Sequence, residues 1–531
     1  HFIISTQAVY PKVSGCNHQN GHYLIVFFFF SGFGHQRRKL ITSTRSINDE
    51  EEIRSAKSFH EIPSPQGLPY IGNLHKYIVG SLNKYKYQNV LKQYFDTYGP
   101  IFKQTLAGRT TVHICHPSMF QIVYKDEGKV PTILPLLETS KKFRTEEKMS
   151  PGLGNTNGEE WYRLRTAVQK HMMKPGEVSA YLTQTNEVAN DFVENLARLK
   201  NVNNFLQESS KWSLETSGYN CFGRRLGYLH QGTESEQEAL RIIKMNDIQF
   251  SLSTDLKFSL PLYKYYKTAT YKKLFEAEET FTGIADAYLD EALQNIDTQI
   301  TNGNDETIAQ AQVKYKFILA LMQSKNISRK DIGTIVLSLF GDGLRTTVPA
   351  LVSTVYCLAS SPRAQQTLFE EVNSVIGKKQ EVTVEDVANL TYLKACVKEA
   401  LRLFPIGLEV VRLNNKDLVL SGFHIPAGTV IEMNNFNLFS NSSYFKDPES
   451  FIPDRWLRGS DVSVVDPYIV MPFGRGPRMC AGRRFAEQDL YVLVSKLIQK
   501  FKLDWQGGNF TQEYKILVYP DCDTPFKFEP R

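Results

Sequence analysis

The basic loop at residues 472–484 constrains this chain more than any other segment. It reads Pro-Phe-Gly-Arg-Gly-Pro-Arg-Met-Cys-Ala-Gly-Arg-Arg and places one cysteine, Cys480, between a glycine-broken loop and a helical pattern. Gly474 and Gly476 allow backbone conformations that other residues avoid. The apolar positions that follow have the spacing of one helix face: Leu490, Val494, Leu497, Ile498 and Phe501. A sulfur at a helix N-terminus among arginines is predicted to be a thiolate, and a thiolate is a metal ligand.

This loop resembles the haem-binding signature of the cytochrome P-450 superfamily, Phe-Gly-x-Gly-x-Arg-x-Cys-x-Gly. Every fixed place is filled, by Phe473, Gly474, Gly476, Arg478, Cys480 and Gly482. The resemblance implies that Cys480 is the ligand to the iron of haem b (iron protoporphyrin IX). On haem iron, a thiolate favours cleavage of the O–O bond of bound oxygen. The alternative of a buried structural cysteine is disfavoured, because it leaves six matched positions unexplained.

Composition describes an ordinary globular protein. The chain has 531 residues, of which 42% are hydrophobic and 22% charged, which is ample material for a core. Its 7 cysteines are scattered and include no Cys-x-x-Cys pair, which argues against a disulfide scaffold or a zinc site and for a reducing compartment. The net charge of +6 is mild and the basic residues form no single tract, so no nucleic-acid partner is predicted.

The N-terminal part is predicted to be separate from the rest. Residues 23–30 form an apolar run that is well short of the roughly 20 residues needed to cross a bilayer. Arginines, serines and threonines follow, and no acid occurs before Asp49, which is the composition of a mitochondrial transit peptide. We therefore interpret residues 1–46 as a targeting segment. The alternative is a secretory signal or membrane anchor, which would place the protein at the endoplasmic reticulum.

Residues 47–531 show no repeat and no composition shift, which predicts one large domain. Most of it has amphipathic helix periodicity, for example 332–358, which Ser328 and Asp331 would open with a capping box. Residues 112–114 and 430–431 are predicted to be short strands. The predicted fold class is mainly α with a small β region, and this matches the superfamily's fold around a buried haem.

Further motifs resemble the superfamily's cofactor contacts and its structural core. Trp161 and Arg165 match its Trp-x-x-x-Arg pair, which holds a haem propionate, and Arg412 and Arg478 match its other propionate ligands. Indole and guanidinium groups are both donors to a carboxylate. Glu399 and Arg402 match its Glu-x-x-Arg pair, and Arg455 in Pro-Asp-Arg-Trp matches the arginine that completes a buried triad. These three residues are therefore expected to be structural.

Gly341-Asp342-Gly343-Leu344-Arg345-Thr346 resembles the family's oxygen-activation segment. Thr346 occupies the place of the threonine that hydrogen-bonds iron-bound oxygen. The acid that usually precedes it is absent, because Arg345 stands there. Asp342 lies four residues earlier, hence on the same helix face, and is predicted to supply the acid. Glycines and threonines inside a helix also predict a local widening, and Pro349 a kink.

Several features resemble the mitochondrial class that takes electrons from a ferredoxin. Lys394 and Lys398 lie one turn apart, and Arg483 and Arg484 follow the haem loop. The resemblance implies contact with an acidic [2Fe–2S] ferredoxin, with an NADPH-dependent reductase upstream. No Gly-x-Gly-x-x-Gly fingerprint is present, so electrons must come from another protein.

The sequence thus predicts a haem-thiolate monooxygenase of the mitochondrial inner membrane, associated with its matrix side. It would insert one atom of O2 into a lipophilic, steroid-type substrate, as arthropod ecdysteroid hydroxylases of this class do. The alternatives are an isomerase or dehydratase that needs no electrons, a xenobiotic-metabolising monooxygenase, and a haem sensor without enzymatic activity.

Overall fold

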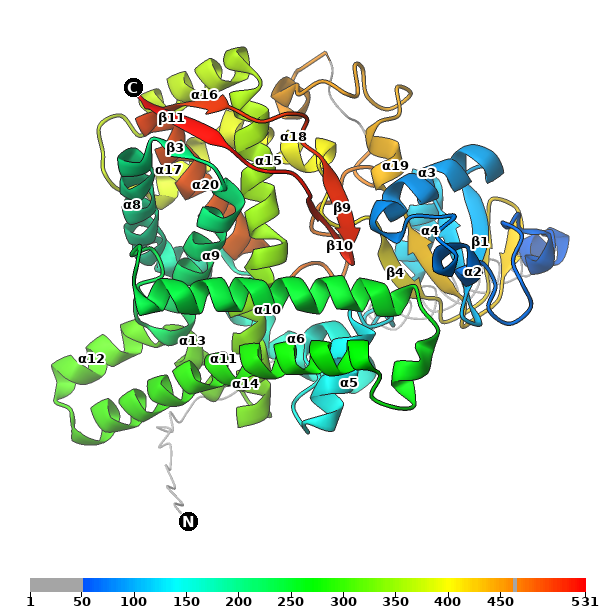
Figure 1. Ribbon diagram of the computed structural model, residues 1–531, viewed down its shortest axis with the longest axis horizontal. Coiled ribbons are helices and arrows are strands. Elements are labelled where there is room, and N and C mark those ends of the chain that lie inside the picture. Colours follow the sequence, from blue (N-terminus) through cyan, green and yellow to red (C-terminus); the bar gives the residue numbers. More distant parts are fainter. Residues whose placement is uncertain (1–50, 462–465) are drawn as a thin grey trace, which may run out of the picture. The chain divides into compact units, whose positions relative to one another are not determined.

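The computed structural model describes residues 51–461 and 466–531 of the chain. Residues Lys57–Arg531 form one compact unit, which is mainly helical with small sheets (Figure 1). The predicted fold class is confirmed. The predicted targeting segment 1–46 lies outside the described residues, so its boundary at residue 47 stays a prediction.

The helices carry the labels of Figure 1. They are α2 Leu74–Ile78, α3 Tyr87–Tyr98, α4 Pro117–Asp126, α5 Glu138–Glu146, α6 Gly158–Met172, α7 Pro175–Val178, α8 Leu182–Leu199, α9 Phe205–Phe222, α10 Glu234–Lys257, α11 Ala269–Asn302, α12 Asp305–Lys314, α13 Lys316–Met322, α14 Arg329–Gly341, α15 Thr347–Ala359, α16 Pro362–Val375, α17 Val384–Asn389, α18 Thr391–Leu403, α19 Phe436–Phe439 and α20 Arg483–Lys500. Short 3-10 turns are η1 Phe59–Glu61, η2 Lys84–Lys86, η3 Leu153–Asn155, η4 Ser179–Tyr181, η5 Pro261–Lys264, η6 Asp342–Arg345 and η7 Pro453–Trp456.

The strands form small sheets. They are β1 Ile101–Leu106, β2 Arg109–Ile114, β3 Asn201–Val202, β4 Val410–Leu413, β5 Leu418–Leu420, β6 Phe423–Ile425, β7 Val430–Met433, β8 Phe501–Trp505, β9 Gln512–Lys515, β10 Leu517–Pro520 and β11 Phe526–Pro530. The largest sheet has the order β1-β2-β7-β4, with β2 and β7 parallel and Val112 opposite Ile431. The two strands predicted from the sequence are therefore present and are direct neighbours.

One helical run crosses the interior, and it is interrupted. α14 opens with the predicted capping box of Ser328 and Asp331. It ends at Gly341, the turn η6 follows, and α15 begins at Thr347, so the predicted widening is wrong: the backbone tightens here instead. Pro349 does not kink the helix, because it lies in the first turn of α15, where N–H groups have no partner within the helix.

This central run is a core helix. Residues Arg329–Ala359 are long and apolar enough to cross a membrane by composition, and no other helix of the described residues is. However, 72% of its most apolar window is buried inside the protein, which is the position of a core element. In Figure 1, α15 stands upright at the centre, and α10 and α11 run side by side across its lower end.

The helix after the haem loop is shorter at both ends than the pattern indicated. α20 begins at Arg483, so Cys480 lies in the loop before it and not at its first turn. Leu490, Val494, Leu497 and Ile498 are buried on the predicted face. Phe501 is buried too, but it is the first residue of β8.

Candidate haem site

The cysteine loop has the backbone that its glycines allow. Gly474 and Gly476 have φ angles of +69° and +76°, in the left-handed region that favours glycine. The N–H of Cys480 donates to the carbonyl of Phe473 at 2.9 Å, which closes the loop on itself. At Gly476 a Cβ atom would overlap the carboxylate of Glu127, so only glycine fits there. These contacts fix the position of the sulfur before any cofactor binds.

Cys480 and Asp342 face one internal space. Both side chains are solvent-accessible. Yet burial raises the pKa of the Cys480 thiol above its usual value, and burial raises the pKa of Asp342 to about 6. The negative charge of Asp342 adds to the shift at Cys480, so the two groups are close. An accessible thiol deep inside the protein is what a metal-bound cofactor requires.

Without a metal ion, burial acts against the thiolate that is predicted at Cys480. The N–H groups of Gly482 and Arg483 and the Arg165 guanidinium lower the pKa of Cys480, but burial outweighs them. A coordinating metal ion deprotonates a thiol outright, and haem iron would supply the missing positive charge.

Three arginines lie around this space, and two of them have no acid partner among the described residues. Arg165 is buried and donates to the sulfur of Met173 at 2.9 Å. Arg478 donates only to uncharged oxygens, those of Pro131, Leu153, Thr156 and Asn157. Burial and the neighbouring Arg412 and Arg165 lower the pKa of Arg478 to about 9. The guanidinium of Arg478 stacks at 4.0 Å from the ring centre of the buried Trp161.

Arg412 is different, because it already holds a carboxylate. Its Nε donates to Glu127 at 2.6 Å, and Nη1 donates to the carbonyl of Val411. Glu127 lies 285 residues earlier in the chain. The buried Glu127–Arg412 pair connects the end of α4 to β4 and lies against Gly476 of the cysteine loop.

The residues present fit a haem. Buried guanidinium groups without an acid are costly, and the two propionates of haem b are suitable partners for Arg165 and Arg478. Trp161, Arg165 and Arg478 would hold the propionates, Cys480 the iron, and Phe473 would pack beside the loop. Once bound, haem supplies the activation of O2.

Arg345 points away from Asp342 and takes no part in this set. It is buried and its guanidinium pairs with Asp247 of α10 at 2.6 Å. It also lies 4.2 Å from the ring centre of Tyr519. Arg345 therefore fastens η6 to α10 and β10.

Thr346 donates its hydroxyl to the carbonyl of Asp342 at 2.8 Å, which ties the two residues of the predicted oxygen-activation segment together.

The predicted structural triad is brought together by the fold. Glu399 accepts from Arg402 at 2.8 Å and from Arg455 at 3.1 Å, and all three side chains are buried. Trp456 also donates to Glu399, at 2.9 Å. Arg402 donates to the carbonyls of Phe439, Pro448 and Ser450, so α18 is joined to the long segment that leads to the cysteine loop.

The four predicted partner-binding residues converge on one surface between α18 and α20. Exposed Lys398 lies 4.0 Å from the ring centre of Trp456, and burial together with the charge of Arg483 lowers its pKa. Lys394 donates to the carbonyl of Ala388. Arg483 and Arg484 both pair with Glu487. Because Glu487 neutralises part of the arginine charge, the lysines are the more available cations.

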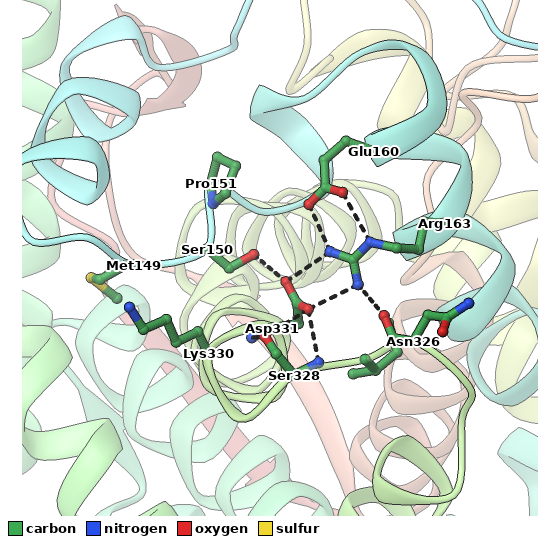
Figure 2. A pocket seen from close by; sticks show the side chains of 10 residues that line it. Met149, Ser150, Pro151, Glu160, Arg163, Asn326, Ser328, Lys330 and Asp331 are labelled. Carbon is green, nitrogen blue, oxygen red and sulfur yellow. Dashed lines mark hydrogen bonds and ion pairs between the residues drawn. The ribbon is translucent and has the colours of Figure 1, made fainter.

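A surface groove beside α6 and α14 shows how the site's elements are held. Figure 2 shows Arg163 between Glu160 and Asp331, with Ser150 beside Asp331. Asp331 is also the third helical residue of α14, where it completes the capping box with Ser328. Although burial opposes the shift, Arg163 and the serines lower the pKa of Asp331 well below the usual range. The groove contains none of the predicted haem residues. Its ion pairs fix α6, which carries Trp161 and Arg165, to the start of α14.

Sequence reasoning missed Glu127, Asp247 and the Arg163–Asp331 pair. Their partners are between 98 and 285 residues away in the chain, so no local pattern connects them. The single signal was the capping box, which identified Asp331 but not its ion pair.

These features define a haem-thiolate protein, and comparison with known proteins gives the family. The sequence model of the cytochrome P-450 family matches residues 62–519, so the chain belongs to the cytochrome P-450 family. Its cofactor is haem, and its activity is that of a cytochrome P-450 monooxygenase.

Individual relatives are similar over nearly the whole chain. A probable cytochrome P-450 of Caenorhabditis elegans, CYP44, is 38% identical over 485 residues, which is 89% of this chain and 94% of the relative. The mitochondrial 1,25-dihydroxyvitamin D(3) 24-hydroxylase of Rattus norvegicus is 31% identical, over 88% of this chain and 89% of the relative. The mitochondrial cytochrome P-450 302a1 of Drosophila melanogaster is 28% identical, over 90% of this chain and 96% of the relative.

Proposed function

We propose that this monooxygenase works in mitochondria, takes electrons from a [2Fe–2S] ferredoxin and hydroxylates a steroid-type lipid. The observation that carries the proposal is the convergence of Lys394, Lys398, Arg483 and Arg484 on one surface next to the cysteine loop. Relatives named as mitochondrial, one of them a hydroxylase of a vitamin D compound, support the compartment and the substrate class.

The reaction consumes one O2, two electrons and two protons for each C–H bond that becomes C–OH, with water as the second product. The ferredoxin supplies the electrons one at a time. This chain's residues hold the cofactor, exclude bulk water and deliver protons. Asp342 has the position for proton delivery, because its side chain faces the internal space near Cys480 and its carbonyl accepts from Thr346.

Asp342→Asn is expected to slow hydroxylation and to raise the hydrogen peroxide released per O2 consumed by several-fold. Burial raises the pKa of Asp342 to about 6, so its carboxyl group can bind and release a proton near neutral pH, whereas an amide cannot. The measurement is coupling efficiency, product formed per O2 consumed, in variants with full haem content.

Arg345→Ala is the matched comparison for that experiment. Arg345 pairs with Asp247 and carries a permanent charge, so its loss should lower thermal stability and leave coupling close to that of the parent protein. Unchanged coupling in Asp342→Asn would show that Asp342 is not the proton donor.

Lys394→Glu combined with Lys398→Glu is expected to lower ferredoxin-driven turnover at least tenfold at low salt and to leave peroxide-driven turnover nearly unchanged. Reversing two charges on one helix turns attraction to an acidic partner into repulsion, which mainly reduces the association rate. The rates are measured against ferredoxin concentration at two ionic strengths.

The control is the exposed pair Lys272 and Lys273 on α11, because replacing both by glutamate changes the net charge by the same amount. Lys272→Glu with Lys273→Glu should affect neither route. An equal loss of both routes in the α18 variant would indicate damage to the Glu399 triad instead of a lost docking contact.

Peripheral association with the inner membrane is part of the same proposal. Two groups of exposed apolar side chains support it: Leu68, Tyr70, Ile78 and Val79, and Leu260, Leu262, Tyr265 and Tyr266. Glu138 links the two groups through its ion pairs. One pair is with Arg109, whose neighbour Gly108 lies close to the carbonyl of Tyr70. The other pair is with Lys264 of η5, in the second group's segment. Clustered apolar side chains of this kind are typical of membrane contact.

An assay with the reconstituted electron-transfer chain tests the proposed function. The haem-loaded protein is combined with a mitochondrial ferredoxin and its reductase, NADPH, O2 and a panel of sterols, ecdysteroids and xenobiotics. Hydroxylated sterol product that requires ferredoxin supports the proposal. Product without electron supply would favour an isomerase or dehydratase, oxidation of xenobiotics alone would favour a xenobiotic-metabolising enzyme, and haem binding without turnover would favour a sensor.

A further inference from the structure

Trp456 lies between the buried Glu399 triad and the predicted partner-binding surface between α18 and α20. It is the last residue of the short turn η7, which packs on α18. Arg455, directly before it, is a member of the triad. The side chain of Trp456 is half-buried, whereas Lys398 of α18, which it contacts, is exposed. Trp456 is therefore placed to connect the interior with this surface.

The N–H edge of the Trp456 indole is fixed in the interior. Its Nε1–H donates to Oε2 of Glu399 at 2.9 Å, and the Glu399 side chain is fully buried. The indole also neighbours the buried ring of Phe445, with the two ring centres 6.4 Å apart. Tryptophan has few side-chain torsions, so one hydrogen bond and one packing contact leave the ring little freedom. The indole is thus a rigid support.

The ammonium group of Lys398 lies over this ring. Its Nζ is 4.0 Å from the ring centre of Trp456, a distance at which a cation is attracted to the face of an indole. Within residues 51–461 and 466–531, no acidic side chain pairs with Lys398. The aromatic contact is therefore what orders this ammonium, and the positive charge of Lys398 is not used inside the protein.

An indole orders a lysine without cancelling its charge. Arg483 and Arg484 each pair with Glu487, which orders their side chains but neutralises part of their charge. A lysine without any contact keeps its charge but is mobile, and an acidic partner must then order it on binding, at a cost in entropy. The contact with Trp456 avoids both disadvantages, because the ammonium of Lys398 is ordered in advance and still carries its charge.

We propose that Trp456 is a positioning residue for the electron-transfer partner: its indole orders Lys398 for contact with an acidic [2Fe–2S] ferredoxin. This inference rests on the proposed function and adds a residue to it. Trp456 acts through Lys398 and requires no contact of its own with the ferredoxin. The aromatic face of Trp456, and not its N–H group, should therefore control the affinity for the ferredoxin.

Two substitutions separate the ring from the N–H group. Trp456→Phe keeps an aromatic face for Lys398 and removes the donor to Glu399. Trp456→Gln removes the ring and keeps an N–H donor, because its amide nitrogen is as many bonds from the backbone as the indole nitrogen is. The Kd for an oxidised mitochondrial [2Fe–2S] ferredoxin is measured by calorimetric titration of the haem-loaded proteins, which requires no substrate.

Trp456→Gln should raise the Kd for the ferredoxin about three- to tenfold, which corresponds to the cost of ordering one flexible side chain on association. Trp456→Phe should raise it by about twofold at most, since a phenyl ring still attracts the ammonium. Both variants keep every charge of the surface. The dependence of Kd on ionic strength should therefore match that of the parent protein, whereas Lys398→Met should make it shallower.

Double variants show whether Trp456 acts through Lys398. In a Lys398→Met background, Trp456→Gln should have no further effect on Kd, because the ammonium that the ring orders is gone. In a Lys394→Met background it should keep its full effect, since Lys394 is held instead by the carbonyl of Ala388. Lys394→Met is thus the matched control, with the same loss of charge on the same helix.

Three results would overturn the inference: an unchanged Kd in Trp456→Gln, an equal loss of affinity in Trp456→Phe and Trp456→Gln, or a loss that persists in the Lys398→Met background. Trp456→Leu also lacks the ring and replaces Trp456→Gln if that variant does not bind haem. Failure of the proposed function has a different signature. In that case the parent protein itself binds no ferredoxin, and the inference fails with it.

Discussion

Replacing Cys480 by serine is expected to abolish the red-shifted absorption band of the reduced carbon monoxide adduct. That band depends on electron donation from a thiolate, and a neutral hydroxyl does not replace it. Serine has nearly the same size, and the loop is held by backbone contacts, such as that of Cys480 to the carbonyl of Phe473. Stability of the haem-free chain should therefore change by no more than about 1 kcal/mol.

The measurement is the reduced carbon monoxide spectrum at equal haem content, with thermal unfolding of the haem-free proteins. Cys522→Ser is the control, since Cys522 is another cysteine that is not fully buried, and its Sγ donates to the carbonyl of Thr511, a bond that a serine hydroxyl can also make. That variant should keep the band. A Cys480→Ser protein with an unchanged band would show that the iron ligand is elsewhere.

Features set by short-range physics could be predicted from the sequence. The capping box of Ser328 and Asp331, the left-handed glycines of the cysteine loop and the two short strands that contain Val112 and Ile431 are all present. Each depends on the conformational preference of a few adjacent residues. The fold class, predicted from helix periodicity and the family resemblance, and the haem cofactor, predicted from the motif around Cys480, are also correct.

The position of the break in the central helix could be predicted from the sequence, but its conformation could not. Glycine and threonine indicated a weak point, yet a weak helix can widen, bend or tighten. Here it tightens into η6, and Arg345 reaches Asp247, 98 residues away, to hold it there. Pro349 kinks a helix if it lies inside it and is tolerated if it lies in the first turn. Which of these occurs depends on the position of the break, and tertiary contacts determine that position.

Charges in the site were the least predictable part. The surrounding arginines suggested a thiolate, but burial raises the pKa of Cys480 and lowers that of Arg478. Desolvation depends on how densely the whole chain packs around a group, and a sequence window does not contain that information. The ion pair between Arg412 and Glu127 could not be predicted either, because the two residues are 285 positions apart in the chain.

Glu399→Gln is expected to lower the free energy of unfolding by at least about 3–5 kcal/mol, since breaking a buried ion pair leaves an unpaired charge. The cost should exceed that of an ordinary pair. One carboxylate neutralises two buried guanidiniums, those of Arg402 and Arg455, and it also accepts from Trp456. A domain with a typical stability of about 5–15 kcal/mol loses much of it, so haem incorporation should fall sharply.

Glu371→Gln is the matched control, because Glu371 is also a carboxylate with several hydrogen bonds to α18. It accepts from the N–H groups of Tyr392 and Leu393 at the start of that helix but neutralises no arginine. The two N–H groups use different oxygens of Glu371, so the amide keeps one of the two hydrogen bonds, and the substitution should cost about 1 kcal/mol, less than the loss at Glu399. Denaturant unfolding of the haem-free proteins gives both values. If the two variants were equally stable, the Glu399 triad would contribute nothing beyond ordinary hydrogen bonding, and its role in fixing the segment before Cys480 would have to be given up.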